Sequence, residues 1–144
     1  MVWEMAHAQT KAWVGEASMP KDQRDILEVL KFELSFLEQG GYGRLPREAW
    51  RARLVFLDSP TCINFNHAAE RIRCAECELM PLVPEAARDQ ETPCNHIPLT
   101  RSGDTLESLY RTGTQREIEA ALGSWLRATI QRVEGERAGK AANL

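Results

Sequence analysis

Apolar residues recur at steps of three and four positions in two long stretches of the chain. In the first stretch they are Ile26, Leu27, Leu30, Leu34 and Leu37. This spacing predicts an amphipathic helix. We expect it to begin near Pro20, because proline is tolerated in a first helical turn, and to end at Gly40 and Gly41, which supply a helix C-cap.

The second stretch lies near the C-terminus and has the clearest helical period in the sequence. Its repeating apolar positions are Ile118, Ala121, Leu122, Trp125, Leu126, Ile130 and Val133. Thr114 and Glu117 have the spacing of a capping box, which fixes the predicted start of this helix. A shorter helix is predicted from Asp104 to about Gly113. The tail after Glu134 is polar, and we expect it to fray.

Three weaker elements complete the outer regions of the chain. Residues 3–17 have one apolar face and predict an N-terminal helix. Residues 42–45 are expected to form a loop, and Pro46 is expected to open a short helix that carries Trp50. Residues 54–57 could contribute at most a short two-stranded element.

The middle of the chain, residues 58–103, has a different character because it holds five of the seven prolines. Proline fixes φ and removes a backbone donor, so long regular elements are not expected here. One helix fits within residues 66–80, and a helical turn fits after Pro84. The sequence therefore predicts a mainly α fold, a small helical bundle with an irregular proline-rich segment. We expect a single domain over residues 1–144, in which residues 1–57 are helical, residues 58–103 form a cysteine- and proline-rich segment, and residues 104–144 are helical.

All four cysteines of the chain, Cys62, Cys74, Cys77 and Cys94, lie in this middle segment, with the spacing C-x11-C-x2-C-x16-C. Four thiols are a complete ligand set for one metal centre. The N-terminus lacks the pattern of a secretory leader, and no apolar run reaches the roughly 18 residues that span a bilayer. We therefore expect a cytoplasmic protein that is not in a membrane. Disulfides are rare in the cytosol, so the sequence favours a metal centre pinning the irregular segment.

Two kinds of centre fit the four thiols. Zinc sites commonly use two C-x-x-C turns, whereas this chain has one, and Glu78 to Met80 read as a continuing helix after it. A [4Fe-4S] cluster is wider and accepts one close pair plus two distant cysteines. The spacing is similar to that of small helical domains that hold an iron–sulfur cluster in this way. Pro60 and Pro93 would stiffen the two outlying ligand loops. Two further possibilities are that some thiols are only buried apolar groups, and that His67 or His96 replaces a cysteine.

The distribution of charged residues along the chain limits the classes of molecule that are expected to bind it. The chain carries a formal charge of −3, and residues 58–103 account for it with four arginines against seven acids. Four thiolates would make this region still more negative, so it is a poor surface for phosphate backbones, and no nucleic acid partner is expected. The overall composition, 43% hydrophobic and 27% charged, is that of an ordinary globular protein. We predict no catalytic residues, because no cysteine–histidine pair has a recognisable orienting group.

The leading hypothesis is a small metalloprotein that binds a [4Fe-4S] cluster for redox sensing, electron transfer or structural stabilisation. The alternative is a zinc-stapled helical adaptor that binds another protein without redox chemistry. Another protein is the expected partner in both cases, with the face of the 3–17 helix as a possible contact surface. The sequence leaves the oligomeric state open.

Overall fold

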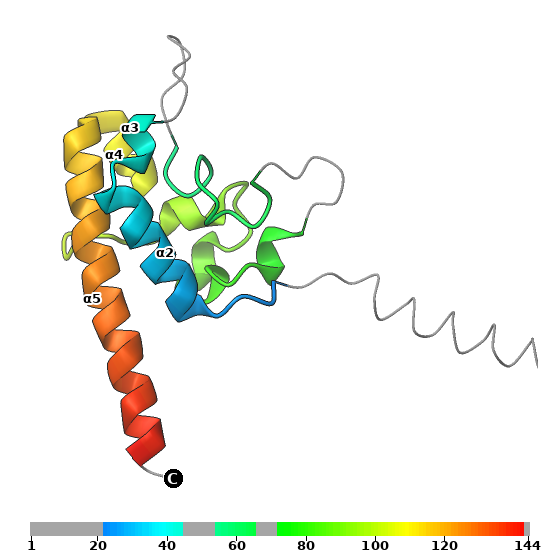
Figure 1. The fold of residues 1–144 in the computed structure, drawn as a ribbon. Helices are drawn as coiled ribbons and strands as arrows, with labels where there is room; N and C mark the ends of the chain where they lie inside the picture. The colour runs from blue at the N-terminus through cyan, green and yellow to red at the C-terminus, as the bar shows by residue number, and fades with distance from the viewer. Residues whose placement is uncertain (1–21, 45–53, 66–71, 143–144) are drawn as a thin grey trace, which may run out of the picture.

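The computed structural model describes residues 22–44, 54–65 and 72–142. Within these ranges the chain forms helices and turns and contains no β-strand, which confirms the mainly α fold (Figure 1). The predicted N-terminal helix with its proposed contact face, and the predicted helix after Pro46, lie outside the described residues.

Two helices, α2 (Ile26–Glu38) and α5 (Gln115–Ala142), form the frame of the molecule and run antiparallel side by side (Figure 1). Their apolar stripes supply much of the core, including Leu30, Leu122 and Leu126, which have no exposed surface. Ion pairs cross the two helices at the surface, and such exposed pairs contribute little to stability. The frame is therefore held mainly by burial of the two stripes that the sequence predicts.

The predicted first long helix differs from α2 at its start. The chain is not helical over residues 22–25, and Asp25 is the N-cap residue, so the helix does not begin near Pro20. Its predicted end is confirmed, because Gly40 has a φ of +73° and directly follows the C-cap. The predicted loop at 42–45 is wrong: Gly41–Arg44 forms a short helix, α3, which places the Tyr42 side chain in the core.

The C-terminal elements follow the prediction with two changes. The short helix α4 spans Leu106–Thr112 and therefore begins two residues after the predicted start at Asp104, with Thr105 and Ser108 as its capping box. Thr114 caps α5 as predicted, since its hydroxyl accepts the Glu117 N–H at 3.2 Å. The tail does not fray after Glu134 but remains helical to Ala142. Pairs such as Arg132–Glu136 support this exposed end of α5.

The middle of the chain forms an irregular lobe beside α2, built from short 3₁₀ turns (Figure 1). These are η1 (Cys74–Glu76), η2 (Met80–Leu82), η3 (Glu85–Ala87) and η4 (Pro93–His96). Turn η3 follows Pro84 as predicted. The predicted helix over 66–80 is wrong where the chain is described, because Cys77 is already extended (ψ 142°). Residues 54–57 form turns, not a strand. No helix in the described ranges is long and apolar enough to cross a membrane.

Candidate metal centre

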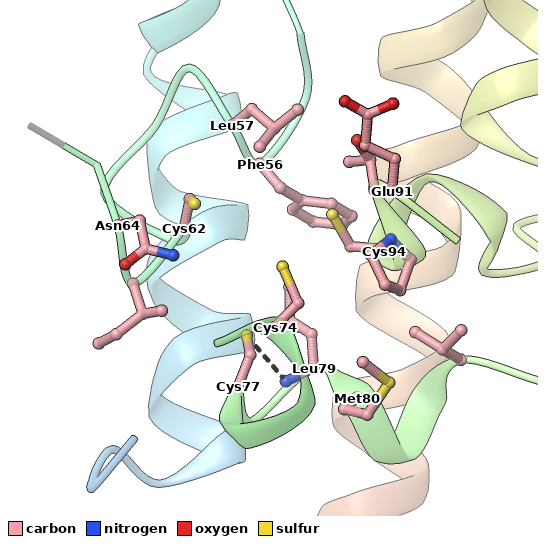
Figure 2. A pocket seen from close by; sticks show the side chains of 14 residues that line it. Phe56, Leu57, Cys62, Asn64, Cys74, Cys77, Leu79, Met80, Glu91 and Cys94 are labelled. Atoms are coloured by element: carbon pink, nitrogen blue, oxygen red, sulfur yellow. Dashed lines mark hydrogen bonds between the residues drawn. The ribbon is translucent and has the colours of Figure 1, made fainter. Parts of the chain in front are cut away.

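All four cysteines line one cavity of about 250 Å³ in the irregular lobe. Figure 2 shows their sulfur atoms facing this common space from three separate segments of the chain. Cys74 is exposed, whereas the other three are partly buried, and all four thiols are free. The wall between them is largely apolar and includes Phe56, Leu79 and Val83, all of which are almost fully buried. The structure thus brings together the four residues that the sequence singled out.

The Cys62 segment is shaped by an unusual backbone conformation at Phe56. Phe56 has a φ of +67°, a left-handed geometry that a bulky residue adopts only when its surroundings enforce it. Its N–H donates to the Tyr42 hydroxyl at 2.9 Å, and its carbonyl accepts the N–H groups of Ser59 and Cys62. The aromatic ring fills the core against Trp125 and also lines the cavity. The strained turn therefore fixes both the Cys62 backbone and one wall of the cavity.

A buried carboxylate on α2 anchors this turn. Glu33 has no exposed surface and accepts hydrogen bonds from three hydroxyls: Tyr42 at 2.7 Å, Ser59 at 2.8 Å and Thr61 at 2.5 Å. Burial raises the pKa of Glu33, although the three hydroxyl donors oppose that shift. Because Thr61 directly precedes Cys62, the Glu33 carboxyl ties a ligand segment to the helical frame.

The second segment is a tight turn that carries Cys74 and Cys77. The Cys77 N–H donates to the Cys74 carbonyl at 3.0 Å. The Leu79 N–H donates to the Cys77 sulfur at 3.5 Å (Figure 2). Hydrogen bonds of this kind stabilise a thiolate and tune a bound centre. The expectation of a continuing helix here was one argument against zinc, and this turn removes it.

The Asn64 side chain joins the first two ligand segments. It donates to the Ile72 carbonyl and accepts the Ile72 N–H, both at 2.7 Å, so it pairs with Ile72 as a backbone unit would. Asn64 also lines the cavity. These two hydrogen bonds hold the segment that carries Cys62 against the segment that carries Cys74 and Cys77.

Cys94 supplies the third segment, on turn η4 directly after the buried Pro93. Burial raises the pKa of Cys94 to about 12, and the charges of Cys62, Cys77 and Cys74 add to the effect. Burial also raises the pKa of Cys77. The mutual influence of the four sulfurs reflects their gathering around one space, which cannot hold several thiolates unless a positive centre compensates them.

Within residues 22–44, 54–65 and 72–142, no three His, Cys, Asp or Glu side chains are placed to hold one metal ion. Four thiolates on one zinc, each at about 2.3 Å, would lie within about 4 Å of one another. Four cysteine thiols are a donor set suited to a metal centre, and in this structure they line one cavity.

Within the described residues, no histidine lines the cavity. His96 lies on η4 but pairs with Glu107 of α4, with 3.0 Å between Nδ1 and the carboxylate. His67 lies outside the described residues. Among the apolar residues of the lobe, Ile63 and Leu79 line the cavity, and Ile97 is buried in the adjoining core.

Two polar features near the site were missed by sequence reasoning. One is Glu33, and the sequence held a signal for it: a charged residue lies on the apolar stripe between Leu30 and Leu37, at the same three- and four-residue steps. The other is an ion pair between Asp22 and Arg24, 2.7 Å apart, which contacts the backbones beside Cys62 and Cys77. No periodicity in the sequence predicts this pair, because Thr61 and Glu78, whose backbones it contacts, lie far from it in the sequence.

No protein-family model, curated protein or solved structure matches this chain. The geometry and chemistry of the cavity are therefore the basis for inferring a function.

Proposed function

We propose that this protein binds a [4Fe-4S] cluster through Cys62, Cys74, Cys77 and Cys94 and uses it for redox sensing or electron transfer. The observation that carries the proposal is the convergence of all four sulfurs on one cavity of about 250 Å³. They come from three segments that are separately anchored to the fold. Such convergence favours a shared ligand over four unrelated buried thiols, which need no common space.

We favour a cluster over zinc because the four cysteines lie around a cavity that could hold a group larger than a single ion. Iron–sulfur clusters are held by cysteine thiolates at the corners of a multi-atom core, so their ligands stand farther apart than those of a single ion. The four cysteines line one cavity, and no three described His, Cys, Asp or Glu side chains are placed to hold a single metal ion. The apolar wall and the N–H donor to Cys77 are also features that tune iron–sulfur clusters.

The exposure of the cysteines favours a redox role over a purely structural one. Cys74 is exposed, whereas Cys94 is the most deeply desolvated thiol, so the cavity has one edge open to solvent. A centre held there would be reachable by a small oxidant or by a second protein at the Cys74 edge. A sealed structural centre would need no such opening.

A zinc-stapled adaptor is the second candidate. The tight Cys74–Cys77 turn, with an N–H donated to the second sulfur, is equally suited to two zinc ligands. Zinc would require the segments of Cys62 and Cys94 to move inward until all four sulfurs meet one ion.

Purification of the full chain without oxygen, followed by iron, acid-labile sulfide and zinc analysis, tests the proposal. We expect a coloured protein with iron and sulfide in equal amounts, about four of each per chain. A colourless protein with one zinc per chain would reject the cluster in favour of the adaptor. A metal-free protein with four alkylatable thiols would reject both.

Substitution of each cysteine by serine tests the assignment of ligands. Each of the four variants should lose the centre to a similar extent, while far-UV circular dichroism still shows α2 and α5, which pack on each other. Met80→Leu is the matched control, because Met80 lines the same cavity with a sulfur that is not assigned as a ligand. If Cys62→Ser or Cys94→Ser kept the full metal content, the four-thiol centre would be wrong as drawn, and His67 would be the next ligand to test.

A further inference from the structure

The ion pair just before α2 lies against two of the four ligand segments. The Asp22 side chain is fully buried, and Arg24 has 29% of its side chain exposed. Asp22 accepts from Arg24 twice, from Nε at 2.9 Å and from Nη2 at 2.7 Å, so the guanidinium and carboxylate form a planar two-bond fork. Such forks are the most specific ion pairs that proteins form.

Each member of the pair also contacts the backbone beside a ligand. Arg24 Nη1 donates to the Thr61 carbonyl at 2.9 Å, directly before Cys62. Asp22 accepts the Glu78 N–H at 3.0 Å, directly after Cys77. The pair therefore bridges two segments that belong to the same cavity but lie on opposite sides of residues 66–71.

The pair places one positive and one negative charge beside the segments that carry Cys62 and Cys77. Hydrogen bonds from Arg24 and from the Glu78 N–H keep the pKa of Asp22 low despite its burial, so the carboxylate is ionised. Among the described residues that line the cavity, Glu91 is the only charged one, and it is exposed to solvent. Exposed charges are screened by solvent, whereas the Asp22 carboxylate is fully buried beside the Cys77 segment.

We propose that Asp22 and Arg24 are positioning residues for the cluster site: the pair fixes the separation of Cys62 and Cys77, and its charges set the reduction potential of the centre. This inference rests on the proposed cluster. The Arg24 cation stabilises the more negative, reduced centre and raises the potential, whereas the Asp22 carboxylate lowers it. The residues do not bind the centre; they act through the backbones of its ligands and through their charge.

The first test measures positioning and does not require a metal. Amide hydrogen exchange is followed at Glu78 in the full-length protein as purified, for wild type, Asp22→Asn, Arg24→Gln and Arg24→Lys. We expect faster exchange at Glu78 in Asp22→Asn and Arg24→Gln. Arg73→Gln is the control, because Arg73 adjoins Cys74 but is solvent-exposed and pairs only with Glu76 among described residues. Unchanged exchange in both Asp22→Asn and Arg24→Gln would overturn the positioning role.

The second test measures the midpoint potential of the bound cluster at pH 8, where Asp22 stays ionised. Arg24→Gln should lower the potential and Asp22→Asn should raise it, by shifts on the order of the 59 mV that equal a tenfold change for one electron. Arg24→Lys keeps the charge but loses the fork, so it should retain a potential near that of wild type while exchange at Glu78 rises.

A lower potential in Arg24→Gln together with a higher potential in Asp22→Asn cannot come from loosening of the site alone, because loosening would shift both potentials in the same direction. Shifts of the same sign, or shifts no larger than that of Arg73→Gln, would overturn the electrostatic role. A wild-type protein without iron would reject the proposed function and this electrostatic role with it, and the exchange measurement would then decide the positioning role alone.

Discussion

Replacement of Glu33 is the sharpest test of how the helical frame holds the cysteine lobe. Its carboxyl is fully buried and is the common acceptor for the hydroxyls of Tyr42, Ser59 and Thr61. Glu33→Ala removes this acceptor and leaves the three hydroxyls facing a small void. Glu33→Gln keeps the shape and one acceptor oxygen, and hydroxyls can rotate to accept from its amide.

The expected loss of stability follows from the three hydrogen bonds that the Glu33 carboxyl accepts. Each hydrogen bond contributes about 1 kcal/mol net, and the void left by Ala adds a further cost. Burial of the carboxyl offsets some of this, as the raised pKa of Glu33 indicates. We therefore expect Glu33→Ala to lower the free energy of unfolding by about 2–4 kcal/mol, and Glu33→Gln by about 1 kcal/mol near neutral pH.

The effect also has a defined pH dependence. Because burial raises the folded-state pKa of Glu33, the folded chain holds the proton more tightly than the unfolded chain. Its stabilising contribution is therefore complete below the ordinary value of 4.5 and is lost as the pH rises through the folded-state pKa. Wild type should accordingly lose stability relative to Glu33→Gln as the pH increases from about 4.5, since Gln does not titrate.

Urea unfolding, followed by far-UV circular dichroism at several pH values, measures both effects. Glu38→Ala is the control, because Glu38 lies on the same helix but is exposed. Glu33 does not anchor the lobe if Glu33→Ala is no more destabilising than Glu38→Ala. Its pKa is not raised in the folded state if the free energies of unfolding of wild type and Glu33→Gln change in parallel with pH. Metal retention should also fall in Glu33→Ala, since Thr61 positions Cys62.

Three further predictions concern thiol reactivity and single hydrogen bonds. After the metal is removed by a chelator, iodoacetamide at pH 8 should alkylate Cys74 fastest and Cys94 slowest, because Cys74 is exposed and burial raises the pKa of Cys94 to about 12; equal rates by peptide mass spectrometry would contradict this burial order. Tyr110→Phe removes the acceptor of the Val55 N–H at 2.8 Å and should cost about 1–2 kcal/mol in equilibrium unfolding, whereas no loss would mean that water replaces the hydroxyl. Thr105→Ala removes the N-cap of α4 and should cost about 1 kcal/mol, with Thr105→Ser, which retains the hydroxyl, as the matched control.

The sequence by itself determined the helical frame. The stripes of α2 and α5 appear as three- and four-residue periods, because a helix repeats every 3.6 residues and one face must be buried. The end of α2 at Gly40 and the capping of α5 by Thr114 were also readable, since both depend on residues within a few positions. The four candidate ligands could be named from their clustering alone.

The tertiary structure decided how the irregular lobe is folded and where the sulfurs lie. Pro20 suggested an early start for α2, but Asp22 and Arg24 stay outside the helix because they bond to the backbones of Glu78 and Thr61, which are distant in sequence. Tyr42 enters a short helix because its hydroxyl joins Glu33 to the Phe56 backbone, a bridge that no local pattern records.

The Cys74–Cys77 segment shows the same limit at the site itself. The sequence could accommodate one helix within residues 66–80 that includes both cysteines, whereas the structure has a 3₁₀ turn that ends in an extended Cys77. Long-range bonds on both sides of the turn, from Asn64 to Ile72 and from Glu78 to Asp22, outweigh that local preference. Periodicity is a local property and specifies helices, whereas the separation of four sulfurs is set by hydrogen bonds between segments that only the folded chain brings together.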